Sequence, residues 1–196
     1  DIEAISKSGA SKGDIGVAGS FALTISDIDT GAAIEGGASV DAGNGPVSLT
    51  AENSSRTTTS AEAAQSGGNT VGVGASIALT VEETRARATI GDGVLLTNAG
   101  DVTLTALSAN DVTTTAKAGA GGSGTTIGGA IALTVAQHET AATIGAAGVH
   151  GPLSVGSLSA SATHRGQSRT EADATVHGGG EAAVGAALAL NLVDQT

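Results

Sequence analysis

The sequence predicts an all-β chain, a β-solenoid of the right-handed β-helix type built from repeats of about 56 residues. One phrase recurs around four leucines, at spacings of 56, 54 and 57 residues: Leu23, Leu79, Leu133 and Leu190. Within each copy, larger apolar residues alternate with small ones at the period of two that is typical of a strand. The dense Gly and β-branched residues and the missing 3.6-residue period exclude a helix.

Each repeat contains the same phrases in the same order. An anchor phrase (VGVGASIALTV, 71–81) is followed by a segment that ends in isoleucine (ATI, 88–90). A Gly-led phrase (GDVTLTA, 100–106), a Thr/Ala-rich phrase (DVTTTAKA, 111–118) and a Gly-rich turn complete the unit. This order predicts a single domain over residues 1–196, with units at about 15–70, 71–124 and 125–181 and a partial unit at 182–196.

The alternation gives each anchor strand two unlike faces. In the third copy the branched aliphatics are predicted to fill the core: Ile131, Leu133 and Val135. The small residues between them are predicted to form a thin face on which a second layer or another chain lies: Gly128, Ala130, Ala132 and Thr134. The parity of the apolar positions changes after every anchor phrase, so we expect a bulge or corner near residues 26–29, 82–84 and 136–139.

The phrase lengths suggest short coils. At roughly 18–19 residues per coil, three coils make one unit, and stacking at about 4.8 Å per coil gives a rod ~50 Å long. Stacking places Phe21, Ile77, Ile131 and Leu188 at equivalent positions. An antiparallel stack of hairpins or a β-prism, in which the Gly-rich turns reverse the chain, is the alternative.

Composition limits the function classes. The net charge of −11 repels phosphate backbones and anionic lipid surfaces, so we expect no nucleic-acid partner. No stretch of about 20 apolar residues is present, so this segment is not expected to insert into a membrane. The 196 residues contain no cysteine and one aromatic residue, which excludes a disulfide framework and leaves the core to Ala, Gly, Val, Ile and Leu. The opening DIEAISKSGA is not a signal peptide, so the chain looks like a fragment or a mature segment.

The phrases VGVGASIALTV, ATIGDG and GDVTLTA resemble the repeats of large secreted bacterial surface proteins. The resemblance is to leukotoxin-like filamentous adhesins and, through GDVTLTA alone, to the filamentous haemagglutinin type, and it spans residues 15–192. It implies a right-handed β-helix exported across the outer membrane, on or released from the cell surface, without a catalytic motif. The third unit departs from the pattern at VHGPLSVGSLSASATHRG (149–166).

Three patterns that can indicate ligand sites are interpreted as structural. GAGGSG at 119–124 matches a dinucleotide motif, but no helix is predicted after it, so we expect a turn and no cofactor. The corner acids Asp27, Asp29, Glu82 and Glu83, which the third unit replaces with Gln137, His138 and Glu139, are expected to form a solvated charged corner, with calcium as the alternative. The four histidines, without the spacing of a zinc site, are expected in exposed turns and not as metal ligands: His138, His150, His164 and His177.

No catalytic residue is predicted. A G-x-S-x-G elbow is absent, and although a β-helix can carry carboxylate pairs that cleave glycosides, no Trp or Tyr is present to stack on sugar rings. Thr24, Thr80 and Thr134, with the TTT runs at 57–59 and 113–115, are expected to form stabilising ladders by cross-strand hydrogen bonds, with ice binding as the alternative.

The sequence therefore predicts a non-enzymatic structural or adhesive segment of a large secreted bacterial surface protein or extracellular filament. The expected partners are neighbouring repeats or identical subunits, which join through exposed strand edges, and surface ligands of a host or matrix. A carbohydrate-active β-helix enzyme and a calcium- or ice-binding β-repeat are the alternatives.

Overall fold

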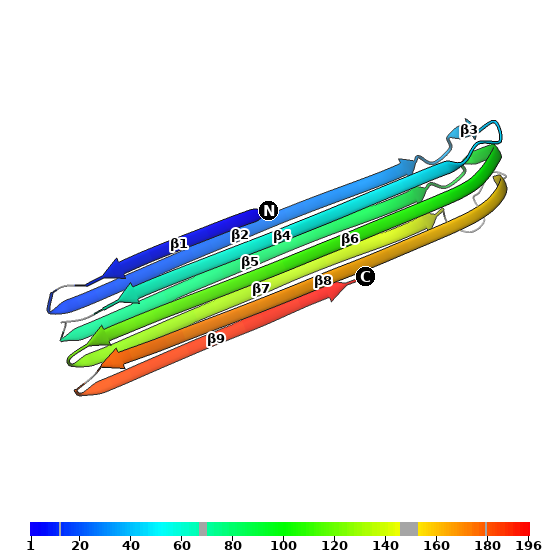
Figure 1. Ribbon diagram of the computed structural model, residues 1–196. Helices are drawn as coiled ribbons and strands as arrows, with labels where there is room; N and C mark the ends of the chain where they lie inside the picture. The colour runs from blue at the N-terminus through cyan, green and yellow to red at the C-terminus, as the bar shows by residue number, and fades with distance from the viewer. Residues whose placement is uncertain (12, 67–69, 146–152, 179) are drawn as a thin grey trace.

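The computed structural model describes residues 1–11, 13–66, 70–145, 153–178 and 180–196 and is all-β, with no helix in these ranges. Two parallel sheets lie face to face, and their long strands run along the long axis of the molecule (Figure 1). Sheet A contains β1 (Ile2–Ala10), β4 (Val47–Gln65), β6 (Leu95–Gly122) and β8 (Leu153–Gly178), with the short β3 (Ser39–Asp41) beside the start of β6. Sheet B contains β2 (Ile15–Ile34), β5 (Val71–Ile90), β7 (Thr125–Ile144) and β9 (Ala182–Gln195).

The pairing register follows the spacing of the anchor leucines. In sheet B it joins residues 56, 54 and 57 positions apart (15 with 71, 71 with 125, 125 with 182). In sheet A the offsets are 55, 55 and 56 positions (2 with 57, 47 with 102, 102 with 158). The predicted equivalence of Phe21, Ile77, Ile131 and Leu188 is confirmed. Because every pairing between these strands is parallel, the alternative of antiparallel hairpins is wrong.

The predicted coil length is also wrong. The chain passes once through sheet B and once through sheet A in each 54–57 residues, so one pass, not three coils, fills a unit. A 20-residue strand such as β5 spans about 66 Å at roughly 3.3 Å per residue. Four strands side by side, about 4.8 Å apart, are only about 14 Å wide between the outer strand axes. The long dimension therefore lies along the strands rather than along the stack.

No bulge or corner forms near residues 26–29, 82–84 or 136–139. The register of sheet B continues through these positions without a shift. The strand keeps its alternation of inward and outward side chains, and only the type of side chain changes. The inward positions change from small residues to a carboxylate at Glu82, and the outward positions change from aliphatic to charged residues at Glu83. A change of side-chain polarity within one straight strand thus produced the apparent change of parity.

The prediction that the aliphatics of the anchor strands fill the core is wrong, whereas a second layer, sheet A, does lie on the face of small residues as predicted. Ala130 and Ala132 are buried between the sheets, whereas Ile131 keeps 42% of its surface exposed on the outside. The reason is the close approach of the sheets at this end of the molecule. A Cβ built on Gly72 would lie 2.6 Å from the carbonyl oxygen of Gly121 in the opposite sheet, so there is no room for branched side chains there.

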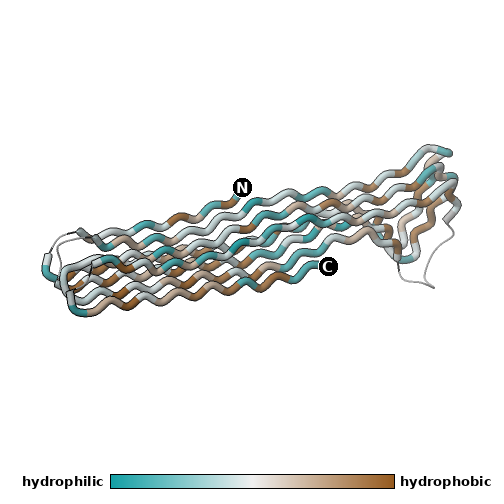
Figure 2. The backbone as a smooth tube through the Cα atoms, turned by 60° about the horizontal axis from the view of Figure 1, so that its bottom comes forward, coloured by the Kyte–Doolittle hydropathy of each residue, from teal (hydrophilic) through white to brown (hydrophobic). Residues whose placement is uncertain are grey.

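The interior has three sections along the strands. Alanines pack near the start of the sheet B strands: Ala22, Ala61, Ala78, Ala116, Ala118, Ala130 and Ala132. Larger aliphatics form a cluster at the opposite end of the molecule, including Ile90, Val94, Leu96, Val102 and Leu104. Polar side chains are buried between these two clusters. Figure 2 shows hydrophobic residues gathered toward both ends and hydrophilic residues in the middle.

Candidate functional site

A chain of six threonine hydroxyls crosses the polar section from one edge of the molecule to the other, alternating between the sheets. Its members are Thr24, Thr59, Thr80, Thr114, Thr134 and Thr170. Successive Oγ1 atoms are 2.7, 2.8, 2.6, 2.7 and 2.7 Å apart, and the donor directions that the geometry fixes all run toward Thr24. A one-way chain of this kind strengthens each of its bonds by polarisation. The predicted threonine ladder is confirmed, although its bonds run between the sheets.

A second buried network surrounds Glu82, which is 1% exposed. Thr57 Oγ1 donates to Glu82 Oε2, and Ser55 Oγ lies 3.3 Å from Glu82 Oε1. Ser55 also donates to Asn110 Oδ1 at 2.8 Å, and Asn110 Nδ2 donates to Thr84 Oγ1 at 3.0 Å. The hydroxyls of Thr57 and Ser55 thus supply the partners that a buried carboxylate requires, and Asn110 links Ser55 to Thr84.

Two histidines extend this network toward β8. His138 Nδ1 lies 2.7 Å from Thr84 Oγ1 and 3.1 Å from Asn110 Nδ2, and its ring stacks on His164 at a centroid distance of 5.3 Å. Burial lowers the pKa of both imidazoles, and the neighbouring His164 lowers the pKa of His138 further. The fold therefore favours the neutral form of both rings. The expectation that these two histidines lie in exposed turns is wrong, because inward strand positions carry them.

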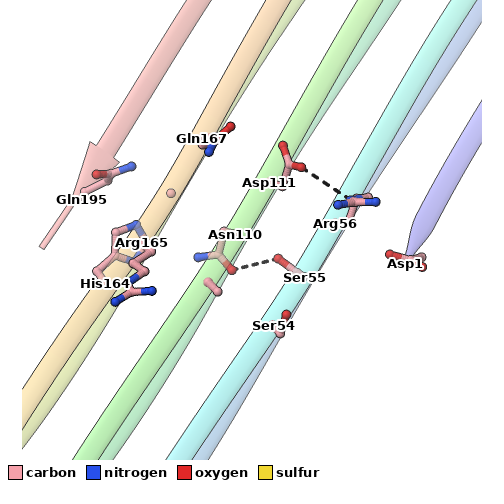
Figure 3. A pocket seen from close by; sticks show the side chains of 12 residues that line it. Asp1, Ser54, Ser55, Arg56, Asn110, Asp111, His164, Arg165, Gln167 and Gln195 are labelled. Carbon is pink, nitrogen blue, oxygen red and sulfur yellow. Dashed lines mark hydrogen bonds and ion pairs between the residues drawn. The ribbon is translucent and has the colours of Figure 1, made fainter.

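A hollow of about 670 Å³ lies beside the polar section, and its lining extends from Asp1 to Gln195 at the end of β9. Figure 3 shows side chains of β4, β6, β8 and β9 and of Asp1 around it, with Asn110 bonded to Ser55 and Asp111 paired with Arg56 at 3.5 Å. His164 and Arg165 line its β8 side. Glu82 is not among the residues that line the hollow, so the one buried carboxylate of the polar section is separated from it. The lining therefore offers hydrogen bonds and charge, and its two acidic side chains are Asp1 and Asp111, of which Asp111 pairs with Arg56.

The four acids proposed for a charged corner do not lie together. Glu82 points into the molecule, whereas Asp27, Asp29 and Glu83 lie on the outer face of sheet B. The three outward-facing acids form ion pairs with arginines. Arg85 pairs with Glu83 and, at 3.3 Å, with Asp27, and Arg87 lies 3.6 Å from Asp29. Arg87 also makes two 3.0 Å bonds to Glu139, which raise the pKa of the guanidinium and lower the pKa of the carboxyl. Two arginines therefore offset part of the charge of these outer acids.

The other expectations about ligand sites have mixed outcomes. His177 is exposed at the end of β8, as expected, and His150 lies outside the described residues. Within the described ranges no three His, Asp or Glu side chains form a group that could hold a metal ion. GAGGSG runs from the end of β6 into the connection to β7, so a strand follows it, as predicted. Thr24, Thr80 and Thr134 are buried, which removes these rows from an ice-binding surface. In the part of the chain that is described, no helix is long and apolar enough to cross a bilayer.

The feature that sequence reasoning missed is the outer face of sheet B. We define the apolar face as the alternate, outward positions of residues 15–25, 71–81, 125–135 and 182–192. None of these 24 positions carries a charge, and several side chains are about half exposed or more, including Ile15, Val17, Phe21, Ile25, Val184 and Leu188. The strand alternation would have revealed this face if it had been followed back from Ile90, which is buried. Every second residue before Ile90 then points inward, and the anchor aliphatics between them point outward.

No family model, curated protein or solved structure matches this chain.

Proposed function

We propose that this chain is a non-enzymatic structural segment of a large secreted bacterial surface protein or extracellular filament, and that it folds as a β-solenoid. One observation carries the proposal: parallel pairing at a nearly constant offset of 54–57 residues joins each segment to the next in both sheets. A unit that pairs with its neighbour in this way can be added without a new interface, which is how repeat proteins gain length and rigidity. Adhesion to a host or matrix surface would follow from display of such a segment.

The interior supports a structural role. The Thr chain and the Glu82 network place partners from adjacent units at hydrogen-bond distance, as between Ser55 and Asn110 at 2.8 Å. Thr80 likewise contacts Thr59 of the preceding unit at 2.8 Å and Thr114 at 2.6 Å. Repeated polar contacts of this kind fix the register of neighbouring strands, since a slip by one residue would bury unpaired groups.

The open edges support growth by further units. Among the described strands, β2 pairs only with β5 and β9 only with β7, so each leaves one edge of sheet B without a partner. Long unpaired edges invite pairing with another strand. The partners we propose are therefore neighbouring repeats or identical subunits.

The test is to lengthen the stack by one unit. A second copy of residues 71–124 is inserted after residue 124, and we expect a folded protein with a higher midpoint of denaturation and a broader scattering envelope across the strands. A copy of residues 98–151 inserted at the same point, after residue 124, is the control: it has the same length but is out of step with the strands on both sides, and it should not gain stability. An inserted unit that unfolds the protein or remains unstructured would overturn the stacking proposal.

The non-enzymatic part has its own test. Release of reducing ends from a panel of bacterial and plant polysaccharides is measured with the intact protein and with Glu82→Gln and Glu83→Gln. We expect no release above a heat-denatured sample. Turnover that either substitution abolishes would assign the protein to the carbohydrate-active enzymes.

A further inference from the structure

The apolar face is large for a surface exposed to water. Eleven residues along each strand, at about 3.3 Å per residue, and four strands about 4.8 Å apart cover about 700 Å². The largest apolar patch on a typical monomer is about 300–600 Å². A standard protein–protein interface takes about 800 Å² from each partner, so two such faces together supply about 1,400 Å², within the range of stable complexes.

The face is also corrugated. Small residues form a trough that crosses the four strands: Gly19, Ala75, Gly129 and Ala186. Larger residues form a ridge two positions further on: Phe21, Ile77, Ile131 and Leu188. A Cβ built on Gly19 or Gly129 would meet no atom within 4 Å, so the trough is open to the outside. Side chains from the trough and the ridge together enclose an apolar hollow of about 360 Å³ over β5, β7 and β9.

We propose that the apolar face binds a second copy of this chain face to face, with the strands of the two copies antiparallel. A two-fold axis that crosses the strands at positions 20, 76, 130 and 187 places each ridge over the trough of the other copy. On β2 this sets Phe21, the largest side chain of the face, against Gly19, the smallest. Such an interface is isologous, since the same surface serves both subunits.

The same axis superimposes the apolar face on itself. It exchanges position 25 with position 15 and position 23 with position 17, so the apolar stretch of one copy covers that of the other from end to end. The charged stretch that follows, which begins at Asp27 and Glu83, then extends past the partner instead of facing it. These charged side chains therefore stay hydrated outside the interface. This matters because burying an unpaired charge would cost binding free energy.

The opposite orientation fits poorly. With the axis along the strands, β2 of one copy faces β9 of the other, so the ridge residue Phe21 meets the ridge residue Leu188 and the troughs face each other. Ridges in contact hold the sheets apart, and empty troughs lose packing contacts. The corrugation thus selects the antiparallel arrangement.

The first test compares two lysine substitutions on outward positions of β7. The wild-type protein should sediment as a dimer at micromolar concentration. Ile131→Lys places a charge on the ridge and should raise the dissociation constant about 100-fold or more, because each dimer buries two such charges. Gln137→Lys, six residues further along the same face, is the control and should remain dimeric. Circular dichroism spectra that match the wild type show that both variants are folded.

The second test measures the orientation. Because the chain has no cysteine, Gln137→Cys can be labelled at one site with a donor or an acceptor dye. Across the proposed axis the two labelled positions lie 14 residues apart along the strand, about 46 Å at roughly 3.3 Å per residue. Mixed dimers should therefore show intermediate energy transfer. Near-complete transfer would show the parallel arrangement and overturn the proposal.

Two further results would also overturn it. One is a wild-type protein that stays monomeric up to 100-fold higher concentration, at about 0.1 mM. The other is a monomer that binds phosphatidylcholine vesicles through this face, with binding abolished by Ile131→Lys, since the occupant would then be a lipid surface. Neither outcome bears on the insertion of a repeat unit, so failure here is distinguishable from failure of the proposed function.

Discussion

Gly72→Ala tests the claim that the sheets approach too closely for side chains at one end of the molecule. The added Cβ would lie 2.6 Å from the carbonyl oxygen of Gly121, where an ordinary contact needs about 3.4 Å, so the sheets must separate locally by about 0.8 Å. It would also overlap Gln65 Oε1, which accepts a 2.7 Å hydrogen bond from the Gly121 amide. The substitution therefore strains the packing and removes the partner of a buried N–H group.

The magnitude combines three terms. Overpacking costs about 1–3 kcal/mol and loss of a buried hydrogen bond about 1–3 kcal/mol. Replacing glycine gains about 0.4–1 kcal/mol through the unfolded chain. We expect the free energy of unfolding to fall by about 2–4 kcal/mol, and the melting temperature by about 5–15 °C for a chain of this size. Urea denaturation followed by far-ultraviolet circular dichroism measures the change.

Gly31→Ala is the matched control. Its Cβ would lie on the outer face of sheet B, 3.9 Å from the nearest backbone atom, so only the gain through the unfolded chain remains. We expect this variant to be unchanged or slightly stabilised. If Gly72→Ala proves as stable as Gly31→Ala, the two sheets are not in contact at this end, and the account of why aliphatics lie outside fails.

Two further predictions concern the polar section. Thr80→Val removes the hydroxyl at the middle of the Thr chain and should lower the free energy of unfolding by about 1–3 kcal/mol, while Thr89→Val, on the outer face, should change it by less than about 0.5 kcal/mol. Denaturant titration of both variants measures this, and equal effects would contradict the role of the chain. Burial lowers the pKa of His138 and His164, so below their ordinary pKa of about 6.5 the unfolded chain binds protons that the folded protein does not. Stability should be full above about pH 6.5 and should fall as the pH drops below it. His138→Gln should flatten this dependence between pH 5 and 7, and an unchanged pH profile would refute the assignment.

The sequence predicted the pairing offset because parallel stacking places like residues side by side. Leu23, Leu79 and Leu133 are adjacent in the sheet for the same reason that they recur in the chain. The same logic predicted the Thr ladder, since Thr24, Thr80 and Thr134 are neighbours by register. It could not predict that the ladder is buried, because its bonds depend on the threonines of sheet A and on the distance between the sheets.

The length of the strands was not predictable from phrases. The pattern looks broken after Val81 and Thr80, because the next outward and inward residues are Glu83 and Glu82. The backbone nevertheless continues straight through these positions. Buried Glu82 is the residue that misleads, since a carboxylate is normally expected on a solvated face. Its burial depends on Thr57 and Ser55, which come from another strand and are 25 and 27 positions away.

The outward position of the anchor aliphatics has one physical origin. Larger aliphatics normally enter a core because burial removes more of their surface from water. Near the start of β5 the interior is closed by backbone contacts such as that between Gly72 and Gly121, so Val71, Val73 and Ile77 have only the outer face available. Their apolar surface can be removed from water only by something outside the two sheets. The close approach of the sheets therefore explains both why no aromatic side chain lies in the interior and why the anchor aliphatics are exposed. The apolar face that results is the surface on which we propose that a second copy of the chain packs.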